Sequence, residues 1–100
     1  MIIAKVVGSA VASMKLDALQ SSKLLMVREA DEQGNAAGAP FLAVDLVGAG
    51  EDELVMVSQG STARTAIAGA TGSDRSPADA AIIGILDSLR YFGDMTYRKA

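Results

Sequence analysis

The sequence predicts a mainly β fold, in which five short strands and one or two short helical turns form a small barrel or a sandwich. Three observations favour this class. Aliphatic and β-branched residues gather in five short segments, glycine-containing turns separate them, and one stretch of helical character precedes the last segment. The chain has 100 residues and shows neither a linker nor a repeat, so we expect a single domain over residues 1–100.

The first two strands are expected in the N-terminal third of the chain. Residues Ile2–Val11 are rich in β-branched side chains and indicate one long strand that bends at Gly8. A polar loop over Lys15–Ser22 leads to the apolar run Lys23–Glu29, which indicates a second, largely buried strand. Three turn formers within Asp31–Pro40 then predict a hairpin connection to the next strand.

The middle of the chain predicts two more strands and a helical turn. Residues Phe41–Val47 form the expected third strand, Gly48–Gly50 the turn after it, and Glu53–Val57 the fourth strand. After this strand the pattern changes to small polar residues. The run Ser61–Ala66 predicts a single turn of helix, with Ser61 as its N-terminal cap.

The last third is predicted as a loop, a second helical turn, a strand and a tail. Small residues over Ala68–Ser76 indicate a mobile loop, and the sequence Ser76–Asp79 is typical of a helix start. The isoleucine-rich stretch that follows favours a fifth strand over Ile82–Leu89. The residues Tyr91–Ala100 are polar and are expected to form a tail.

The overall composition predicts an oligomer. Apolar residues make up 50% of the chain and charged residues only 21%, which argues against a disordered protein. A chain of this size and composition has more apolar surface than a small monomer can easily bury. We therefore expect several copies to associate.

Charge and residue types exclude several classes of function. The net charge is −3 and the basic residues are dispersed, whereas nucleic-acid binders cluster Lys and Arg, so we expect no nucleic-acid partner. The chain has no His and no Cys, which excludes thiol nucleophiles, Ser-His-Asp catalysis and the usual zinc ligands, and we expect no metal and no cofactor. Lys5 and Gly8 interrupt the first apolar run, and no segment has the length of a membrane span. We expect a cytoplasmic protein that does not bind membranes.

The stretch from Val44 to Arg64 holds most of the residues that could carry chemistry. The glycines Gly48 and Gly50 resemble the start of a dinucleotide fingerprint, but a third glycine and a following helix are missing. The acids Glu51–Glu53 could bind a cation, yet adjacent strand residues point to opposite faces. We interpret the glycines as a turn and the acids as solvated.

Two aspartates stand inside apolar strands and could be buried acids. Asp45 and Asp87 could form a catalytic pair, or each could accept hydrogen bonds that hold a corner or a subunit contact. We favour the structural interpretation, with Arg64 as the natural partner for one of them. Ser58, Ser61 and Thr62 have no evident base, so no catalytic residue is expected.

Four motifs in order give the chain a family resemblance. The opening I-A-K-V-V-G-x-x-V-A-S begins at Ile3, D-x-V-G-A-G begins at Asp45, G-S-x-A-R begins at Gly60, and P-x-D-A-A-I-I-G-I-L-D begins at Pro77. Together they resemble the EutN/CcmL family of bacterial microcompartment vertex proteins. One departure is Asp52, where many members of the family have glycine.

The resemblance implies an OB-like five-stranded β-barrel with one or two short helical turns. It further implies a homopentamer that closes the vertices of a polyhedral shell, whose facets are built from other, hexameric or pseudohexameric, shell proteins. Such a protein is structural and not an enzyme. The alternative is a single-stranded nucleic-acid-binding module, because OB barrels often serve that use, but few aromatic residues and a negative charge argue against it.

The resemblance and the residues together suggest where subunits meet. Because glycine and serine permit close backbone approach and arginine can clamp a carboxylate, we expect the corner that begins at Gly60 to form a subunit contact. In this hypothesis Ser61 and Thr62 lie near the fivefold axis, and Arg64 pairs across the seam with an acid such as Asp45. The tail is expected to pack on a neighbouring protomer or on a facet protein. The residues expected in the subunit interface or axial region are Asp45, Gly48, Gly50, Gly60, Ser61, Thr62 and Arg64.

Overall fold

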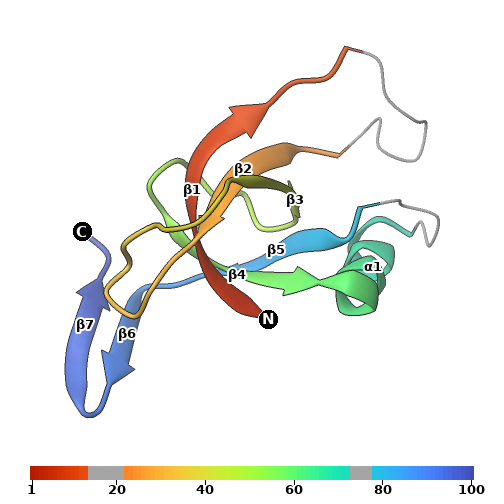
Figure 1. Ribbon diagram of the computed structural model, residues 1–100. Coiled ribbons are helices and arrows are strands. Elements are labelled where there is room, and N and C mark those ends of the chain that lie inside the picture. The colour runs from red at the N-terminus through yellow and green to blue at the C-terminus, as the bar shows by residue number, and fades with distance from the viewer. Residues whose placement is uncertain (14–21, 73–77) are drawn as a thin grey trace.

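The computed structural model describes residues 1–13, 22–72 and 78–100, and it contains seven strands and one helix within them (Figure 1). Most of the expected loop Lys15–Ser22, together with Ser76 and Pro77 of the expected second helical turn, lies outside the described residues. The elements in chain order are β1 (Ile2–Ala10), β2 (Leu24–Glu29), β3 (Phe41–Asp45), β4 (Leu54–Gln59), α1 (Gly60–Thr71), β5 (Ala80–Ile85), β6 (Ser88–Tyr91) and β7 (Asp94–Arg98).

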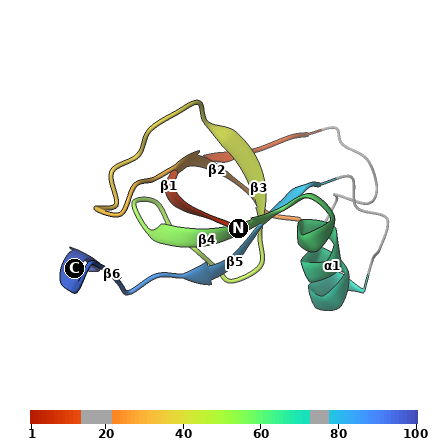
Figure 2. The ribbon, with the colours of Figure 1, turned by 60° about the horizontal axis from the view of Figure 1, so that its bottom comes forward.

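The first five strands form a closed barrel in the order β1-β2-β3-β5-β4 (Figure 2). All neighbours are antiparallel except β3 and β5, which run parallel and are linked through β4 and the helix. The long first strand shifts register between Val6 and Gly8, where a bend was expected. Closure pairs the edges of the sheet with each other, so the mainly β, five-stranded barrel expected from the sequence is confirmed.

The core of the barrel consists of small aliphatic side chains. Along each strand every second residue points inward, and on β1 these residues are Ala4 and Val6. A narrow barrel interior has little room for aromatic rings, which agrees with the four aromatic residues of the whole chain. The buried residues of this cluster are Ala4, Val6, Leu25, Val27, Ala43, Ala49, Val55, Val57, Ala80 and Ile82.

Helix α1 is longer than the sequence predicted. It runs for 12 residues, and Ala63 and Ile67, one turn apart, pack against β3 and β5 in a second buried cluster with Val44 and Ala81. The helix ends at Gly72, whose φ of 77° is the left-handed conformation typical of a C-terminal glycine. Residues 68–71 were expected to belong to a loop, and this prediction is wrong because they are helical.

The start of the helix also differs from the prediction. The N-terminal cap is Gln59 in extended conformation, with no side-chain hydrogen bond, and Ser61 lies inside the first turn. Close to the second expected helical turn, Ala78 and Asp79 are not helical and β5 begins at Ala80. Local propensity underestimates the length of this helix, because burial of two of its residues stabilises an Ala- and Thr-rich segment as a helix.

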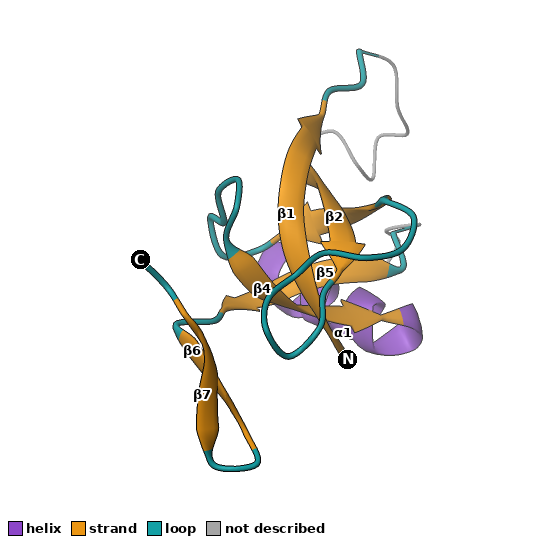
Figure 3. Cartoon of the chain, turned by 60° about the vertical axis from the view of Figure 1, so that its left-hand side comes forward, coloured by secondary structure: helices purple, strands orange, loops and turns teal. Residues whose placement is uncertain are grey.

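The C-terminal residues form a hairpin rather than an irregular tail (Figure 3). The expected fifth strand is divided, because β5 ends at Ile85 and β6 begins at Ser88. Strands β6 and β7 pair with each other and with no strand of the barrel, and the hairpin extends away from it. The molecule is elongated as a result, with dimensions of 44 × 24 × 22 Å.

Candidate subunit interface

The turn after β3 is organised by the carboxylate of Asp45. Its oxygens accept hydrogen bonds from the backbone N–H groups of Val47 and Gly48, both at 3.1 Å, and of Ala49 at 3.0 Å. The Nζ of Lys23 lies 3.7 Å from the second carboxylate oxygen. Only 1% of the Asp45 side chain is exposed, so these groups enclose the carboxylate. The third strand consequently ends at Asp45 and not at Val47.

Within one chain, Asp45 and Arg64 do not pair. Asp45 contacts Lys23 instead, and among residues 1–13, 22–72 and 78–100 no carboxylate lies within ion-pair distance of Arg64. Because the Asp45 side chain is almost fully enclosed within its own chain, it has no room for a guanidinium group from a neighbouring copy either. The hairpin register could have identified Lys23, since Leu24 pairs with Val44 and places Lys23 beside Asp45.

The acidic turn before β4 is tied to the C-terminus of the chain. One oxygen of Glu53 accepts the backbone N–H of Gly50 at 2.6 Å, and the other lies 2.6 Å from the Nζ of Lys99. The hydrogen bond from Lys99 and the one from Gly50 hold the pKa of the Glu53 carboxyl below its ordinary value of 4.5. Glu53 is thus a structural contact between the barrel and the hairpin.

The other acids that the sequence analysis considered lie apart from one another in the described part of the chain. Glu51 and Asp52 are exposed, and no group of three or more ligand residues suited to a metal is found in the described part of the chain. Asp87, expected to be buried in a strand, is exposed between β5 and β6. It therefore cannot form a buried acid pair with Asp45.

The corner after β4 joins the strand directly to helix α1. Gly60 has a φ of 66° and donates its N–H to the carbonyl of Asp79 at 2.7 Å, which holds the helix start beside β5. Ser61, Thr62 and Arg64 are exposed, whereas Ala63 between them is buried. The corner therefore presents small polar side chains and one arginine to the outside.

The exposed face of α1 has a shallow hollow of about 350 Å³, lined by Ser61, Arg64, Thr65 and Ala68. The hydroxyl of Thr65 donates to the carbonyl of Ser61 at 3.0 Å, so this hydroxyl bonds within the helix. Small side chains let another backbone approach closely, and the guanidinium offers several donors to a carboxylate. The hollow suits contact with a second protein surface better than binding of a small molecule, because it is open and has few converging polar groups.

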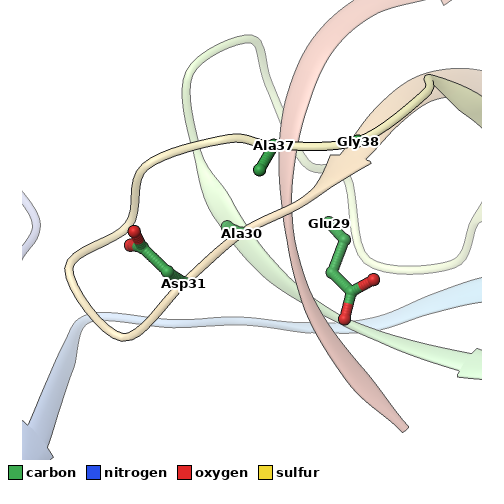
Figure 4. A pocket seen from close by; sticks show the side chains of 5 residues that line it. All are labelled: Glu29, Ala30, Asp31, Ala37 and Gly38. Carbon is green, nitrogen blue, oxygen red and sulfur yellow. The ribbon is translucent and has the colours of Figure 1, made fainter.

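A second hollow, of about 330 Å³, lies between the two arms of the long loop that joins β2 to β3 (Figure 4). Two acids contribute to it, and Figure 4 shows that the carboxylates of Glu29 and Asp31 point away from each other. One oxygen of Asp31 accepts the N–H groups of Gln33 and Asn35, each at 2.9 Å, and so shapes the loop. The carboxylates therefore do not converge on a common point, as acid–base catalysis on one substrate would require.

Several large apolar side chains remain exposed on the single chain. Exposed side chains of this kind are available for contact with another protein surface. No helix among the described residues is long and apolar enough to cross a lipid bilayer. The exposed large hydrophobic residues are Met1, Val7, Val11, Leu42, Val47, Tyr91, Phe92 and Met95.

Known proteins are similar to this chain over the barrel and beyond it. The family model described as ethanolamine utilisation protein EutN/carboxysome matches residues 1–87. The bacterial microcompartment shell vertex protein GrpN of Rhodospirillum rubrum is 42% identical over 89% of this chain and 96% of its own. The carboxysome shell vertex protein CcmL of a Nostoc species is 39% identical over 97% of this chain and 93% of its own.

Solved structures show the same fold in these relatives. The structure of Nostoc CcmL has a TM-score of 0.87 and 39% identity, and the match covers 99% of this chain and 100% of that one. The Rhodospirillum rubrum GrpN structure, a pentameric microcompartment shell protein, has a TM-score of 0.79 and 37% identity. That match covers 91% of this chain and 99% of GrpN.

Proposed function

The chain belongs to the EutN/CcmL family, and on this premise we propose that five copies form a ring that caps a vertex of a bacterial microcompartment shell. The observation that carries the proposal is the match to shell vertex proteins along nearly the whole chain, in sequence and in fold. The relatives of this chain are structural shell proteins and not enzymes. Nothing supports the alternative of a module that binds single-stranded nucleic acid.

The closed barrel limits how copies can associate. Each of the five barrel strands pairs on both sides within its own chain, so a neighbour cannot add a strand to the barrel. Copies must therefore meet through side-chain surfaces and loops. A cyclic ring further needs two different, complementary patches on each copy, because every chain meets one neighbour with each patch.

The corner from Gly60 to Arg64 is the first of these patches in our proposal, with Ser61 and Thr62 near the fivefold axis. Support comes from the exposure of small side chains there and from the buried Ala63, which fixes the helix beneath them. Arg64 has no carboxylate partner among the described residues and can bind one on the adjacent copy.

The turn held by Asp45 contributes a second part of the interface. Asp45 itself acts from within, since its enclosed carboxylate fixes the turn and does not reach the surface. Gly48 and Gly50 are exposed on the outside of this turn, beside the exposed side chain of Val47. Glycines there allow a neighbouring chain to approach the backbone closely.

The second class of partner in our proposal is the hexagonal facet protein of the shell. A flat layer of hexagonal tiles cannot close on itself, and a pentagonal unit introduces the curvature that closure requires. A vertex ring must consequently bind on two kinds of surface, one towards its own copies and one towards the tiles. Permanent contacts within a ring are expected to be the more apolar of the two.

The ring is tested by native mass spectrometry. The chain has a mass of 10.2 kDa, so a ring of five copies has a mass of about 51 kDa. The substitution Ser61→Trp places a large side chain on the proposed patch and should reduce the ring to smaller species. Ser9→Trp, at an exposed serine on β1, is the matched control and should leave the mass unchanged.

Two results would count against these proposals separately. A wild-type chain that stays at 10.2 kDa at high concentration would contradict the ring itself. A Ser61→Trp variant that retains the wild-type mass would leave the ring in place but exclude the Gly60–Arg64 corner as its contact.

A further inference from the structure

We propose that residues 88–100 form an arm that leaves its docked position on the barrel and returns to it while the barrel stays folded. The arm consists of the β6–β7 hairpin and the two residues after it, and Figure 3 shows how it extends away from the barrel. The inference concerns each single chain and goes beyond the proposed function, because it does not depend on how many copies form the ring.

The core of the protein is complete without the arm. Among the described residues none after Ile82 is buried, and Ile85 is the last residue in chain order that packs against a buried cluster. Within the arm, Leu89, Thr96 and Tyr97 are half-buried and the other residues are exposed. Segments that bury few side chains open at a lower free energy than the core does. The arm can therefore leave the barrel without exposing the barrel core.

A hinge of two residues, Leu86 and Asp87, connects the arm to the barrel. The N–H of Leu86 donates to the carbonyl of Leu54 on β4 at 2.8 Å, and this bond belongs to the barrel. The carbonyl of Asp87 accepts the N–H of Lys99, also at 2.8 Å, and this bond closes the base of the arm. Rotation of the backbone between these two bonds moves the arm and leaves the strand pairing of the barrel intact.

The docked position is held on one side of the arm, by strand β7 and the loop between β2 and β3. The Tyr97 ring packs directly on Gly34 of this loop, and the Thr96 hydroxyl donates to the carbonyl of Glu32. The strands β6 and β7 contact each other extensively, and no barrel strand contacts either of them to a comparable extent. A small, local set of contacts of this kind can break in a single step.

The ion pair between Lys99 and Glu53 fastens the end of the arm to the turn before β4. The Nζ of Lys99 lies 2.6 Å from an oxygen of Glu53, and the two side chains are 41% and 22% exposed. Because water and salt reach both groups, the pair contributes little free energy and is weakened by salt. Salt should therefore favour the undocked state.

The hairpin depends on docking for its own stability. A hairpin of two strands is only marginally stable in water when nothing packs against it. Its turn consists of Phe92 and Gly93, which both have positive φ, 53° and 82°. Asn-Gly and Gly-Gly are the usual sequences of such a turn, because a bulky side chain is strained there. An undocked arm should consequently lose its cross-strand hydrogen bonds, so amide hydrogen exchange reports undocking.

Undocking changes one part of the surface and leaves the rest as it is. The arm carries the exposed rings of Tyr91 and Phe92, which meet edge to face with centroids 4.6 Å apart, so their direction changes when the arm moves. The proposed ring contact from Gly60 to Arg64 lies on the barrel side of the hinge and keeps its geometry in both states. The fold thus combines a constant barrel with one movable aromatic surface.

The test is amide hydrogen exchange of the full-length chain, followed by mass spectrometry. The amides of β6 and β7 should exchange roughly a hundredfold or more faster than those of β1 and β4. Lys99→Met removes the ion pair and should accelerate exchange in the hairpin about threefold, with the barrel unchanged. Lys23→Met is the matched control, because it removes a lysine that pairs with Asp45 on the barrel, and hairpin exchange should stay as in the wild type.

Salt separates undocking from fraying of the hairpin within its docked position. At about 1 M NaCl the ion pair is screened, so hairpin exchange in the wild-type chain should rise to the rate of Lys99→Met. The variant itself should respond little to salt, because it has lost the pair.

Three results would overturn the inference. Hairpin amides that exchange as slowly as the barrel amides would show that the arm does not undock. Acceleration of barrel and hairpin together in Lys99→Met would show that both unfold as one unit. Hairpin exchange that slows as the protein concentration rises would show that a neighbouring copy holds the arm. A chain that forms no ring is recognised separately by its native mass, and this exchange test applies to it unchanged.

Discussion

At the scale of single residues, two side chains decide how the turns beside the barrel are built. Asp45 folds the turn after β3 around its carboxylate, with three backbone N–H groups and Lys23 as partners. Asp52, at the position where the family resemblance leads us to expect glycine, has a φ of 68°. The left-handed backbone explains the glycine of other members, and Asp tolerates this region better than most residues.

The Asp45 turn gives the first prediction. Asp45→Ala leaves three N–H groups of the turn without their acceptor and should lower the free energy of unfolding by about 2–4 kcal/mol. Lys23→Ala is the control, because the Lys23 side chain is 61% exposed and 3.7 Å from the carboxylate. It should cost less than about 1 kcal/mol. Urea denaturation measures both, and equal losses would mean that the N–H groups do not depend on Asp45.

At the scale of elements, the hairpin and the β2–β3 loop depend on each other. The loop returns the chain from β2 to β3 and places Gly34 under the Tyr97 ring, while β7 ends near the acidic turn at Glu53. Neither segment belongs to the barrel, and each limits the motion of the other. Their contact is long-range in sequence, so local patterns could not reveal it.

Two glycines of the loop separate the effect of packing from that of backbone conformation. Gly34 and Gly38 have nearly equal φ, 81° and 80°, so Ala strains the backbone equally at both. A Cβ on Gly34 would lie 2.7 Å from the Tyr97 ring, whereas a Cβ on Gly38 would meet nothing within 4 Å. Gly34→Ala should therefore cost about 1–3 kcal/mol more than Gly38→Ala.

Urea denaturation measures this difference, and amide hydrogen exchange locates it. Exchange of the β7 amides should accelerate in Gly34→Ala and stay unchanged in Gly38→Ala, because only the first substitution displaces Tyr97. If the two variants lose the same stability, the ring does not pack on Gly34 as described.

The contact between Glu53 and Lys99 is predicted to weaken both at low pH and at high pH. The pKa of Glu53 is lowered from 4.5, so its stabilising effect is present above that value and is lost as the pH falls through the lowered pKa. The pKa of Lys99 is raised from 10.5 by the hydrogen bond to Glu53, so its effect is present below 10.5 and is lost as the pH rises through the raised pKa.

An NMR titration of the Glu53 carboxyl carbon tests this contact. Lys99→Met should raise the pKa of Glu53, because it removes the largest cause of the shift. Lys23→Met removes a lysine that pairs with Asp45 instead and should leave the Glu53 titration unchanged. An unchanged Glu53 pKa in Lys99→Met would show that the pair is not formed in solution.

At the scale of the whole molecule, the barrel closes its own sheet yet leaves apolar side chains outside. Val7 on β1, Leu42 on β3 and Val47 after it are all at least 40% exposed in the single chain. The interior is filled mainly with alanine and valine, which bury less apolar area than larger residues. Much of the stability of the protein should therefore arise when copies associate.

This balance predicts a melting temperature that depends on concentration. Folding coupled to association is favoured by mass action, so dilution of the wild-type chain should lower its melting temperature by several degrees over a hundredfold range. Differential scanning fluorimetry across that range measures the effect. The Ser61→Trp variant should melt at a lower temperature, and its melting temperature should depend less on protein concentration. A wild-type midpoint that is independent of concentration would argue for a self-sufficient monomer.

Much of this protein was determined by the sequence alone. The five barrel strands, the hairpin after β2 and the turn at Gly48–Gly50 follow from local alternation and turn residues, which act within a few positions. The absence of His and Cys excluded thiol nucleophiles and Ser-His-Asp catalysis, and four short motifs in order indicated the family.

Only the tertiary structure decided how distant segments are combined. The hairpin between β2 and β3 brings Lys23 to Asp45, although 22 positions separate them in the chain, so the partner of Asp45 within its own chain is Lys23 and not Arg64. Helix α1 extends to 12 residues because Ala63 and Ile67 are buried against the barrel. The small side chains of this segment do not indicate that burial in the sequence. Local propensity is read from neighbours in sequence, whereas burial and pairing are set by neighbours in space.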